Sequence, residues 1–202
     1  MTDERLKLFT KMYRHIHKRR RDALWRGVPL WKFPTDISLY HEAIFEKKPD
    51  TIVEIGTARG GSSLYFQDML DIINPGGKVI TVDISDRLKM KRDNRITYII
   101  GDSQNKETAK HVKSLVTGKV MVTIDGEHKR PAVKWDLHNY SPLVTHGQYL
   151  VVEDCYTDKG LWGPGEAKEW FLKTHKSFEQ TDKCSRYMVG MTMEGWLIKN
   201  GT

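Results

Sequence analysis

The sequence predicts an α/β fold with a seven-stranded, mostly parallel sheet, and three observations support it. From residue 50 onward, short apolar runs alternate with helix-length segments, which is the pattern of βαβ units in a sheet covered on both faces. The segment 185–199 holds two strand-like runs with no helix between them, which predicts an antiparallel hairpin at the end. The 202 residues suffice for one domain with a substantial core.

Residues 1–26 are predicted to form a basic amphipathic arm. Its apolar residues recur at spacings of three and four, as on one face of a helix: Leu6, Phe9, Tyr13 and Ile16. The arm carries nine lysines or arginines against three acidic residues, so it holds most of the net charge of +7. Such a patch suits nucleic acid, an anionic membrane surface or an acidic partner subunit. We favour a helix that docks its apolar stripe and leaves the basic face in solvent.

Residues 27–49 are predicted to form an irregular lead-in followed by a helix over about 36–46. Thr35 or Asp36 is the expected N-cap. The buried side of this helix is expected to contain Ile37, Tyr40, Ile44 and Phe45.

Residues 50–202 are predicted to form the α/β domain. Its five apolar strands are expected at 51–56, 78–84, 96–103, 119–126 and 148–154. The helices between them are expected at 61–73, 104–116, 130–141 and 165–175. The final two strands are expected to join around Met193, Glu194 and Gly195.

The composition predicts a cytoplasmic protein. Only Cys155 and Cys184 are present, which is no disulfide framework and favours a reducing compartment. The first residues lack the apolar run of a signal peptide, and the chain contains no apolar stretch long enough to span a membrane.

Acidic and polar residues follow every predicted parallel strand, at the edge where open α/β sheets bind ligands. They include Asp83, Asp102 with Ser103, Asp125, and the adjacent pair Glu153 and Asp154. Two neighbouring carboxylates beside an apolar strand are costly unless a cation lies between them. The alternative is a strand that simply ends in a solvated loop.

The loop after the first strand indicates the kind of ligand. Gly56, Gly60 and Gly61 match neither the dinucleotide G-x-G-x-x-G pattern nor a nucleotide P-loop. Glu54 suits a ligand with an amino group, and Asp83 is placed to accept ribose hydroxyls. S-adenosylmethionine has both features. The predicted cofactor contacts are Glu54, Gly56, Thr57, Gly60, Gly61, Ser62, Asp83, Asp102 and Ser103.

Two of these assignments have open alternatives. Asp102 and Ser103 either contact the cofactor or cap the helix that begins at 104. Trp162, in the segment DKGLWGPGE, either lines the mouth of the substrate site or packs on a neighbouring residue.

Several motifs together resemble the cephalosporin hydroxylase family: PLWKFPTD, VEIGTARGGSSLYF, GDS, IDGEH and YLVVED. Its members include Rossmann-like class I methyltransferase-fold proteins similar to the metal-dependent O-methyltransferases of macrolide and rhamnosyl sugars. The resemblance covers roughly residues 25–199. It implies a divalent ion, usually Mg²⁺, held by residues that match Asp125, Glu153 and Asp154. It also implies a general base that matches His128.

The chemistry agrees with this implication. A sugar hydroxyl is a poor nucleophile, and a divalent ion beside it lowers its pKa while a histidine takes the proton. The sequence therefore predicts a Mg²⁺- and S-adenosylmethionine-dependent O-methyltransferase of a sugar, a glycoside or another vicinal diol, with Asp125 and His128 catalytic. We expect a homo-oligomer. Family members often have Ser-Asp where this chain has Gly126 and Glu127, so the surroundings of the metal are expected to differ.

Three alternatives stay open at this stage. A nucleic-acid methyltransferase would bind the phosphate backbone with the basic arm, although no N-P-P-Y motif is present. A non-enzymatic role would use the arm and residues 28–46 for assembly. An oxygenase, as the family name suggests, would need two histidines and one carboxylate around iron, and no such set is evident.

Overall fold

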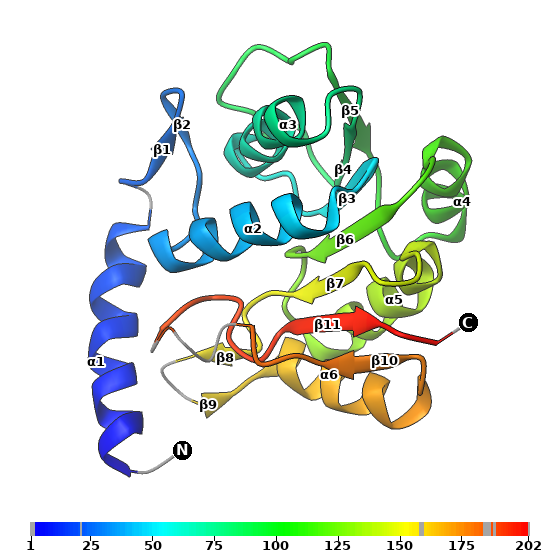
Figure 1. The fold of residues 1–202 in the computed structure, drawn as a ribbon. Coiled ribbons are helices and arrows are strands. Elements are labelled where there is room, and N and C mark those ends of the chain that lie inside the picture. Colours follow the sequence, from blue (N-terminus) through cyan, green and yellow to red (C-terminus); the bar gives the residue numbers. More distant parts are fainter. Residues whose placement is uncertain (1–2, 21, 158–159, 184–186, 188, 202) are drawn as a thin grey trace.

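The structure is a computed structural model that describes residues 3–20, 22–157, 160–183, 187 and 189–201. Figure 1 shows the order of its elements. The helices are α1 (Asp3–Arg19), α2 (Pro34–Lys47), α3 (Gly61–Ile73), α4 (Lys106–Leu115), α5 (Arg130–Tyr140), the short 3₁₀ helix η1 (Ser141–Leu143) and α6 (Gly163–Thr174). The strands are β1 (Leu24–Trp25), β2 (Val28–Pro29), β3 (Thr51–Ile55), β4 (Lys78–Asp83), β5 (Ile96–Ile100), β6 (Val120–Ile124), β7 (Tyr149–Val152), β8 (Tyr156–Thr157), β9 (Gly160–Leu161), β10 (Phe178–Gln180) and β11 (Trp196–Lys199).

The central sheet has seven strands in the order β10-β11-β7-β6-β3-β4-β5. Strands β3 to β7 pair in parallel, and β11 runs antiparallel to both β7 and β10. The predicted α/β fold with a seven-stranded, mostly parallel sheet is therefore confirmed. The strand order reverses at β3, which lies between β4 and β6. In open α/β sheets such a reversal creates a crevice at the carboxyl ends of the strands.

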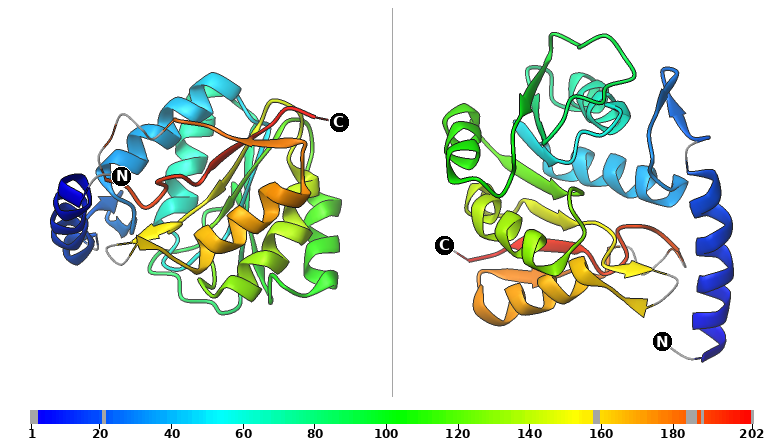
Figure 2. Two further views of the ribbon diagram at one scale, coloured as in Figure 1. Left: turned by 90° about the horizontal axis from the view of Figure 1, so that it is seen from below. Right: turned by 180° about the vertical axis from the view of Figure 1, so that it is seen from behind.

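The sheet is covered on both faces because neighbouring residues of a strand point to opposite sides. On β3, Val53 and Ile55 pack with α4, α5 and α6, whereas Ile52 packs with α2 and α3. Figure 2 shows these helices on the two sides of the sheet. The central strands β3, β6 and β7 are buried on both faces, as their continuous apolar runs in the sequence predict.

The C-terminal antiparallel pair is confirmed, but the position predicted for its first strand and its turn is wrong. β11 pairs with β10 at 178–180, and not with a segment just before residue 193. In the described part of the connection, residues 189–195 form no strand. Asp36 explains part of this difference, because its carboxylate accepts hydrogen bonds from the backbone N–H groups of Met191 and Thr192.

The predicted N-cap of α2 is also wrong. Phe33 occupies the cap position and Pro34 begins the helix, since proline needs no hydrogen-bond acceptor in the first turn. Asp36 is buried instead, and Thr35 donates to the carbonyl of Val189. Of the expected buried residues, Tyr40 and Ile44 lie in the core, but Phe45 is 62% exposed.

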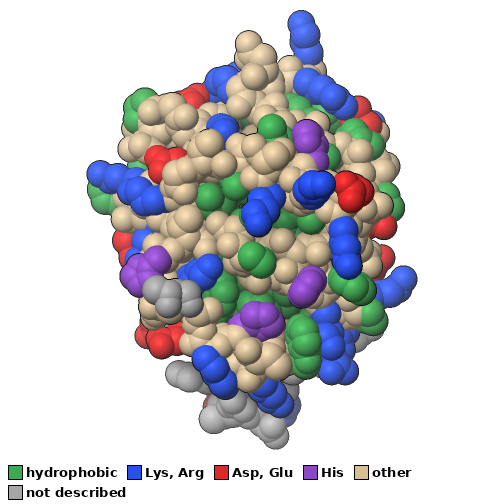
Figure 3. All heavy atoms as spheres, turned by 90° about the vertical axis from the view of Figure 1, so that its right-hand side faces the viewer, with side chains coloured by type: hydrophobic (Ala, Val, Ile, Leu, Met, Phe, Trp, Pro, Cys, Tyr) green, Lys and Arg blue, Asp and Glu red, His purple; other side chains and the backbone are tan. Residues whose placement is uncertain are grey.

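The arm docks as its apolar stripe predicts. Phe9 and Tyr13 of α1 are buried in a cluster with Phe33, Val189 and Met191, and Figure 1 shows α1 beside the end of α2. Leu6 lies outside the residues whose side chains are described. No helix in the described part of the chain combines the length and apolarity needed to cross a bilayer. On the face seen in Figure 3, basic side chains are scattered among acidic, histidine and hydrophobic ones.

Candidate active site

A cavity of about 820 Å³ opens at the carboxyl ends of β3, β4 and β6. Gly56, which follows β3, allows these ends to approach closely. Its φ is +105°, and a Cβ at this position would lie 2.0 Å from the carbonyl oxygen of Asp125. Asp125 donates its N–H to the carbonyl of Ile55, so the loop after β6 is tied directly to β3. Only glycine fits this contact.

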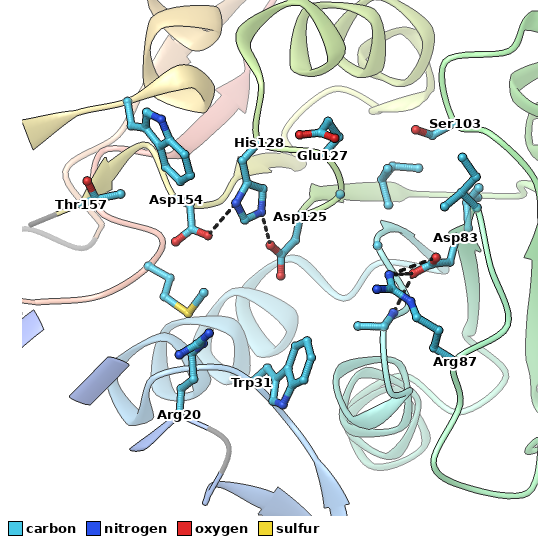
Figure 4. A pocket seen from close by; sticks show the side chains of 18 of the residues that line it. Arg20, Trp31, Asp83, Arg87, Ser103, Asp125, Glu127, His128, Asp154 and Thr157 are labelled. Carbon is cyan, nitrogen blue, oxygen red and sulfur yellow. Dashed lines mark hydrogen bonds and ion pairs between the residues drawn. The ribbon is translucent and has the colours of Figure 1, made fainter. Parts of the chain in front are cut away.

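Asp125, His128 and Asp154 meet in this cavity (Figure 4). Nε2 of His128 lies 3.4 Å from Asp125 Oδ1, and Nδ1 lies 3.5 Å from Asp154 Oδ2. One potential ligand atom from each residue lies within 4.8 Å of the other two. The predicted association of the two strand-end acids with His128 is thus present in the structure.

Asp154 is held in an unusual backbone conformation. Its φ of +54° lies in the left-handed region, which costs a non-glycine residue roughly 1–3 kcal/mol. Its N–H donates to the carbonyl of Met191. Its Oδ1 is buried and finds no hydrogen-bond partner among the described residues. A buried carboxylate oxygen without a donor is the kind of atom that a cation would satisfy.

Lys32 is a site residue that our sequence analysis missed. It is 4% exposed, and its Nζ lies 2.6 Å from Asp125 Oδ2 and 2.8 Å from a carboxylate oxygen of Glu153. It lies in the motif PLWKFPTD, but its neighbours in the sequence do not distinguish it from the other 32 lysines and arginines of the chain. A lysine is seldom buried unless it is paired, and here two carboxylates pair with it.

Glu153 contacts Lys32 and two neutral side chains, and not His128. It is 1% exposed and accepts hydrogen bonds from Lys32, from Tyr40 Oη at 2.6 Å and from Thr123 Oγ1 at 3.3 Å. Its two oxygens therefore already have donors from the protein. The structure does not bring Glu153 into the group formed by Asp125, His128 and Asp154.

The ionisable groups of the cluster influence one another strongly. Burial lowers the pKa of His128, but the nearby Asp125 and Asp154 outweigh this and raise it to about 9. Burial raises the pKa of Asp154 to about 7 and that of Glu153 to about 8. Burial by itself would raise the pKa of Asp125, but the charge of Lys32 and the hydrogen bond to His128 outweigh it and hold this pKa below the usual value.

Asp83 lies at the other end of the cavity, at the end of β4. Its Oδ2 accepts the N–H of Ala58 at 2.9 Å, and Arg87 Nη2 lies 3.3 Å from both of its oxygens. Figure 4 shows this pair well separated from His128. Of the predicted cofactor contacts, Gly56, Asp83, Asp102 and Ser103 line the cavity.

The remaining predicted contacts lie behind this wall. Glu54 is buried and accepts hydrogen bonds from Ser63 and from Thr81 Oγ1. Gly61 begins α3 and packs on the backbone of Pro29, where a Cβ would lie 2.2 Å from a carbonyl oxygen. The described residues that line the cavity do not include Glu54, Thr57, Gly60, Gly61 or Ser62. Asn105, and neither Asp102 nor Ser103, caps α4.

Aromatic residues form part of the wall near His128. Trp162 lines the cavity, is 49% exposed and meets the His128 ring edge-on at 5.7 Å between centroids. Trp31 also lines the cavity, and the guanidinium of Arg59 lies 5.8 Å from its ring. Both alternatives left open for Trp162 are therefore seen, since it lines the cavity and also packs on a neighbouring residue.

The fold and the site together define a class I methyltransferase. The fold has counterparts in solved structures. CmcI in its apo form aligns with a TM-score of 0.72 and 23% identity over 90% of this chain and 78% of that one. A structure of CmcI with Mg and S-adenosylmethionine aligns equally well. The O-methyltransferase TomG from Streptomyces achromogenes, in complex with S-adenosylmethionine, aligns at a TM-score of 0.58 and 18% identity over 100% and 92% of the two chains.

The chain belongs to the Rhamnosyl O-methyltransferase/CmcI family, whose profile matches residues 17–200. A rhamnosyl O-methyltransferase of Mycobacterium leprae is 33% identical over 188 residues, which cover 87% of this chain and 82% of the relative. That of Mycobacterium tuberculosis is 30% identical over 190 residues, with 87% and 78% covered. The predicted family is confirmed, and with it the prediction that the chain is an O-methyltransferase.

Proposed function

We propose that the protein transfers a methyl group from S-adenosylmethionine to a hydroxyl of a sugar or another vicinal diol, with Mg²⁺ or another divalent ion. The observation that carries this proposal is a single cavity whose two ends contain different functional groups. Asp125, His128 and Asp154 lie at one end, and Asp83 with the glycine loop lies at the other. The relatives named above are rhamnosyl O-methyltransferases, which supports a sugar acceptor. The nucleic-acid and oxygenase alternatives have no comparable support.

The donor set fits a hard divalent cation. Mg²⁺ prefers oxygen ligands and is commonly held by one or two carboxylates and water. Asp125 and Asp154 would hold the ion, and the buried Oδ1 of Asp154 has no other partner among the described residues. Glu153, the third ligand predicted from the sequence, would support Asp125 through Lys32. When bound, the ion supplies Lewis-acid polarisation of the acceptor hydroxyl.

The opposite end fits the cofactor. Asp83 is only 6% exposed yet lines the cavity, so its carboxylate can accept ribose hydroxyls there. Gly56 also lines the cavity, so the amino-acid end of the ligand would lie against its backbone. When bound, the cofactor supplies an electrophilic methyl group.

His128 would take the proton from the acceptor hydroxyl. Against the effect of burial, Asp125 and Asp154 raise the pKa of His128 in the metal-free protein, and a divalent ion held by these two carboxylates would offset that effect. A neutral His128 with its proton on Nδ1, directed to Asp154, would then offer Nε2 beside Asp125 as the acceptor. Lys32 would keep Asp125 in place, because one oxygen of this carboxylate binds the ammonium and the other lies near His128. Trp162 would shield this end from water through its contact with the His128 ring.

Calorimetry on EDTA-treated protein tests the proposal. S-adenosylhomocysteine is titrated first, then Mg²⁺. In separate reactions with S-adenosylmethionine as methyl donor, a panel of neutral and charged vicinal diols is incubated with the protein, with and without Mg²⁺, and methylated products are detected by mass spectrometry. We expect the cofactor product to bind in the micromolar range and methylation to require the metal. Absence of cofactor binding in both conditions would overturn the proposal, and full activity with EDTA would overturn its metal-dependent part.

A further inference from the structure

The basic flank of α1 lines the same cavity as the acid cluster. Four basic residues from this region contribute to the wall: Arg14, His17, Lys18 and Arg20. The sequence predicts a helix that leaves its basic face in solvent. The structure instead places part of it at the end of the cavity where the acceptor would bind. Figure 4 shows Arg20 and Trp31 across the cavity from His128.

The docking of α1 determines which of its charges face inward. Phe9 and Tyr13 are buried against Phe33 and Met191, and this fixes the rotation of the helix. Residues 14, 17 and 18 lie on the flank of the helix beside Tyr13, given 3.6 residues per turn. Lys7 and Lys11 are also exposed on α1, but they do not line this cavity. These two lysines belong to the same stripe of α1 as Arg14 and Lys18, so it is their position nearer the start of the helix that keeps them out of this cavity.

The acids described at the acceptor end each lie beside a cation, and a bound divalent ion would offset their remaining charge. Lys32 supplies one positive charge shared by Asp125 and Glu153, and His128 lies between Asp125 and Asp154. The other acid of this wall, Glu127, lies 3.8 Å from Lys129. A divalent ion would add further positive charge. Arg14, Lys18 and Arg20 thus face a region whose acids are largely balanced, which favours an anionic ligand.

Aromatic surface accompanies these cations. Trp31 and Trp162 both line the cavity, and aromatic faces are common partners of the apolar faces of ligands. The volume of about 820 Å³ is at the upper end of the usual range for small-molecule sites. The cavity can therefore hold the cofactor together with a sugar that extends from His128 towards α1.

We propose that the natural acceptor is an anionic sugar whose phosphate or carboxylate is bound by Arg14, Lys18 and Arg20 while its diol lies beside His128. This inference rests on the proposed function and adds the charge class of the substrate. Arginine and lysine bind both anionic groups through charge-assisted hydrogen bonds, so the shared chemistry is a sugar with a negative charge some distance from the methylated hydroxyl.

Two matched double variants test the proposal. Arg14→Gln/Lys18→Gln removes two charges that line the cavity, and Lys7→Gln/Lys11→Gln removes two exposed charges from the same helix outside it. All four side chains are exposed, so both variants are expected to melt like the wild type. The acceptors are three pools of hexoses: methyl glycosides, uronic acids, and hexose 1-phosphates with nucleoside diphosphate hexoses. Each pool contains the gluco, galacto and manno configurations, and the neutral and phosphate pools also contain the rhamno form.

We expect methylated product from an anionic pool and little from the neutral pool. For that acceptor, Arg14→Gln/Lys18→Gln should raise KM about tenfold or more with kcat nearly unchanged, because two charge-assisted contacts are lost. Lys7→Gln/Lys11→Gln should leave KM within about twofold, since distant charges are screened by salt. The pool that yields product distinguishes a phosphate from a carboxylate.

Methylation confined to the neutral pool would overturn the inference, and so would equal KM changes in both variants. Intact binding of S-adenosylhomocysteine and Mg²⁺ with no product from any pool would also count against it. Failure of S-adenosylhomocysteine to bind would instead contradict the proposed function itself. The binding measurement therefore separates the two failures.

Discussion

Nζ of Lys32 lies 2.6 Å from Oδ2 of Asp125, although 93 residues separate them in the sequence. The same ammonium lies 2.8 Å from Glu153. This pairing explains how β7 can end in two adjacent carboxylates. The charge of Glu153 is paired inside the protein with Lys32. Asp154 has a left-handed backbone conformation, and its side chain lines the cavity. The two acids thus lie in different environments.

Replacing Lys32 by methionine should destabilise the fold. The substitution keeps the length of the side chain but leaves the half-buried Asp125 and the buried Glu153 without their cation, and breaking a buried pair typically costs about 3–5 kcal/mol. Urea denaturation of the metal-free protein measures this cost. In the double variant Lys32→Met/Glu153→Gln one of the two unpaired charges is gone, so its cost should be clearly below the sum of the two single variants. Additive effects would contradict a direct ion pair.

Asp154→Asn should weaken metal binding without weakening cofactor binding. The amide keeps the shape of the side chain but removes the charge that attracts a cation, so we expect Mg²⁺ affinity to fall by about tenfold or more. Calorimetry with Mg²⁺ and with S-adenosylhomocysteine measures both affinities. Glu127→Gln is the control, because Glu127 also lines the cavity but lies outside the acid cluster. Equal losses in both variants would argue against a specific site.

Asp83→Asn should weaken binding of S-adenosylhomocysteine by about tenfold to a hundredfold, the usual effect of losing hydrogen bonds to a charged group. Its Mg²⁺ affinity should stay unchanged, since Asp83 lies at the other end of the cavity. Asp86→Asn serves as control because Asp86 is half-exposed, pairs with Arg92 and does not line the cavity. An unchanged cofactor affinity in Asp83→Asn would show that the ribose lies elsewhere.

His128 should make the metal-free protein less stable at high pH. Its pKa in the folded protein is raised to about 9, mainly by Asp125 and Asp154 against the effect of burial, whereas the unfolded value is about 6.5. The stabilisation is therefore complete below about pH 6.5 and is lost as the pH rises through about 9. We expect a contribution on the order of 2 kcal/mol.

Thermal melts in EDTA between pH 6 and pH 10 measure this dependence. The His128→Gln variant should lose less stability than the wild type across that range, because glutamine has no proton to release. Parallel pH curves for the two proteins would contradict the role of His128 as a cation in the metal-free cluster.

Gly56→Ala should disrupt the sheet edge on which the site is built. The new Cβ would lie 2.0 Å from the carbonyl oxygen of Asp125, and the backbone at φ +105° is itself unfavourable for alanine. Gly76→Ala is a matched control, since Gly76 has a φ of +95° but open space around its Cβ position. We expect Gly56→Ala to cost at least about 2 kcal/mol more than the control in chemical denaturation. Similar costs would mean that strain alone, and not the contact with Asp125, restricts Gly56.

Much of the architecture could be predicted from local patterns. The apolar runs of β3, β4, β6 and β7 are continuous because these strands are buried on both faces. β10 has only three residues, one of them buried, so its sequence carries little signal. Similarly, Asp36 resembles a helix cap in sequence, but its partners at 191 and 192 are distant in the chain.

The α/β class, the family and the acids at the strand ends can be predicted from the sequence, because they depend on periodicity and on short motifs. Three features became visible only in the folded chain: Lys32 pairs with Glu153, Glu54 is buried outside the lining of the cavity, and α1 brings cations to the cavity. Each of these depends on how segments far apart in the chain are positioned against one another. An ion pair or a cavity wall forms from side chains of different segments, and no local pattern encodes which segments meet.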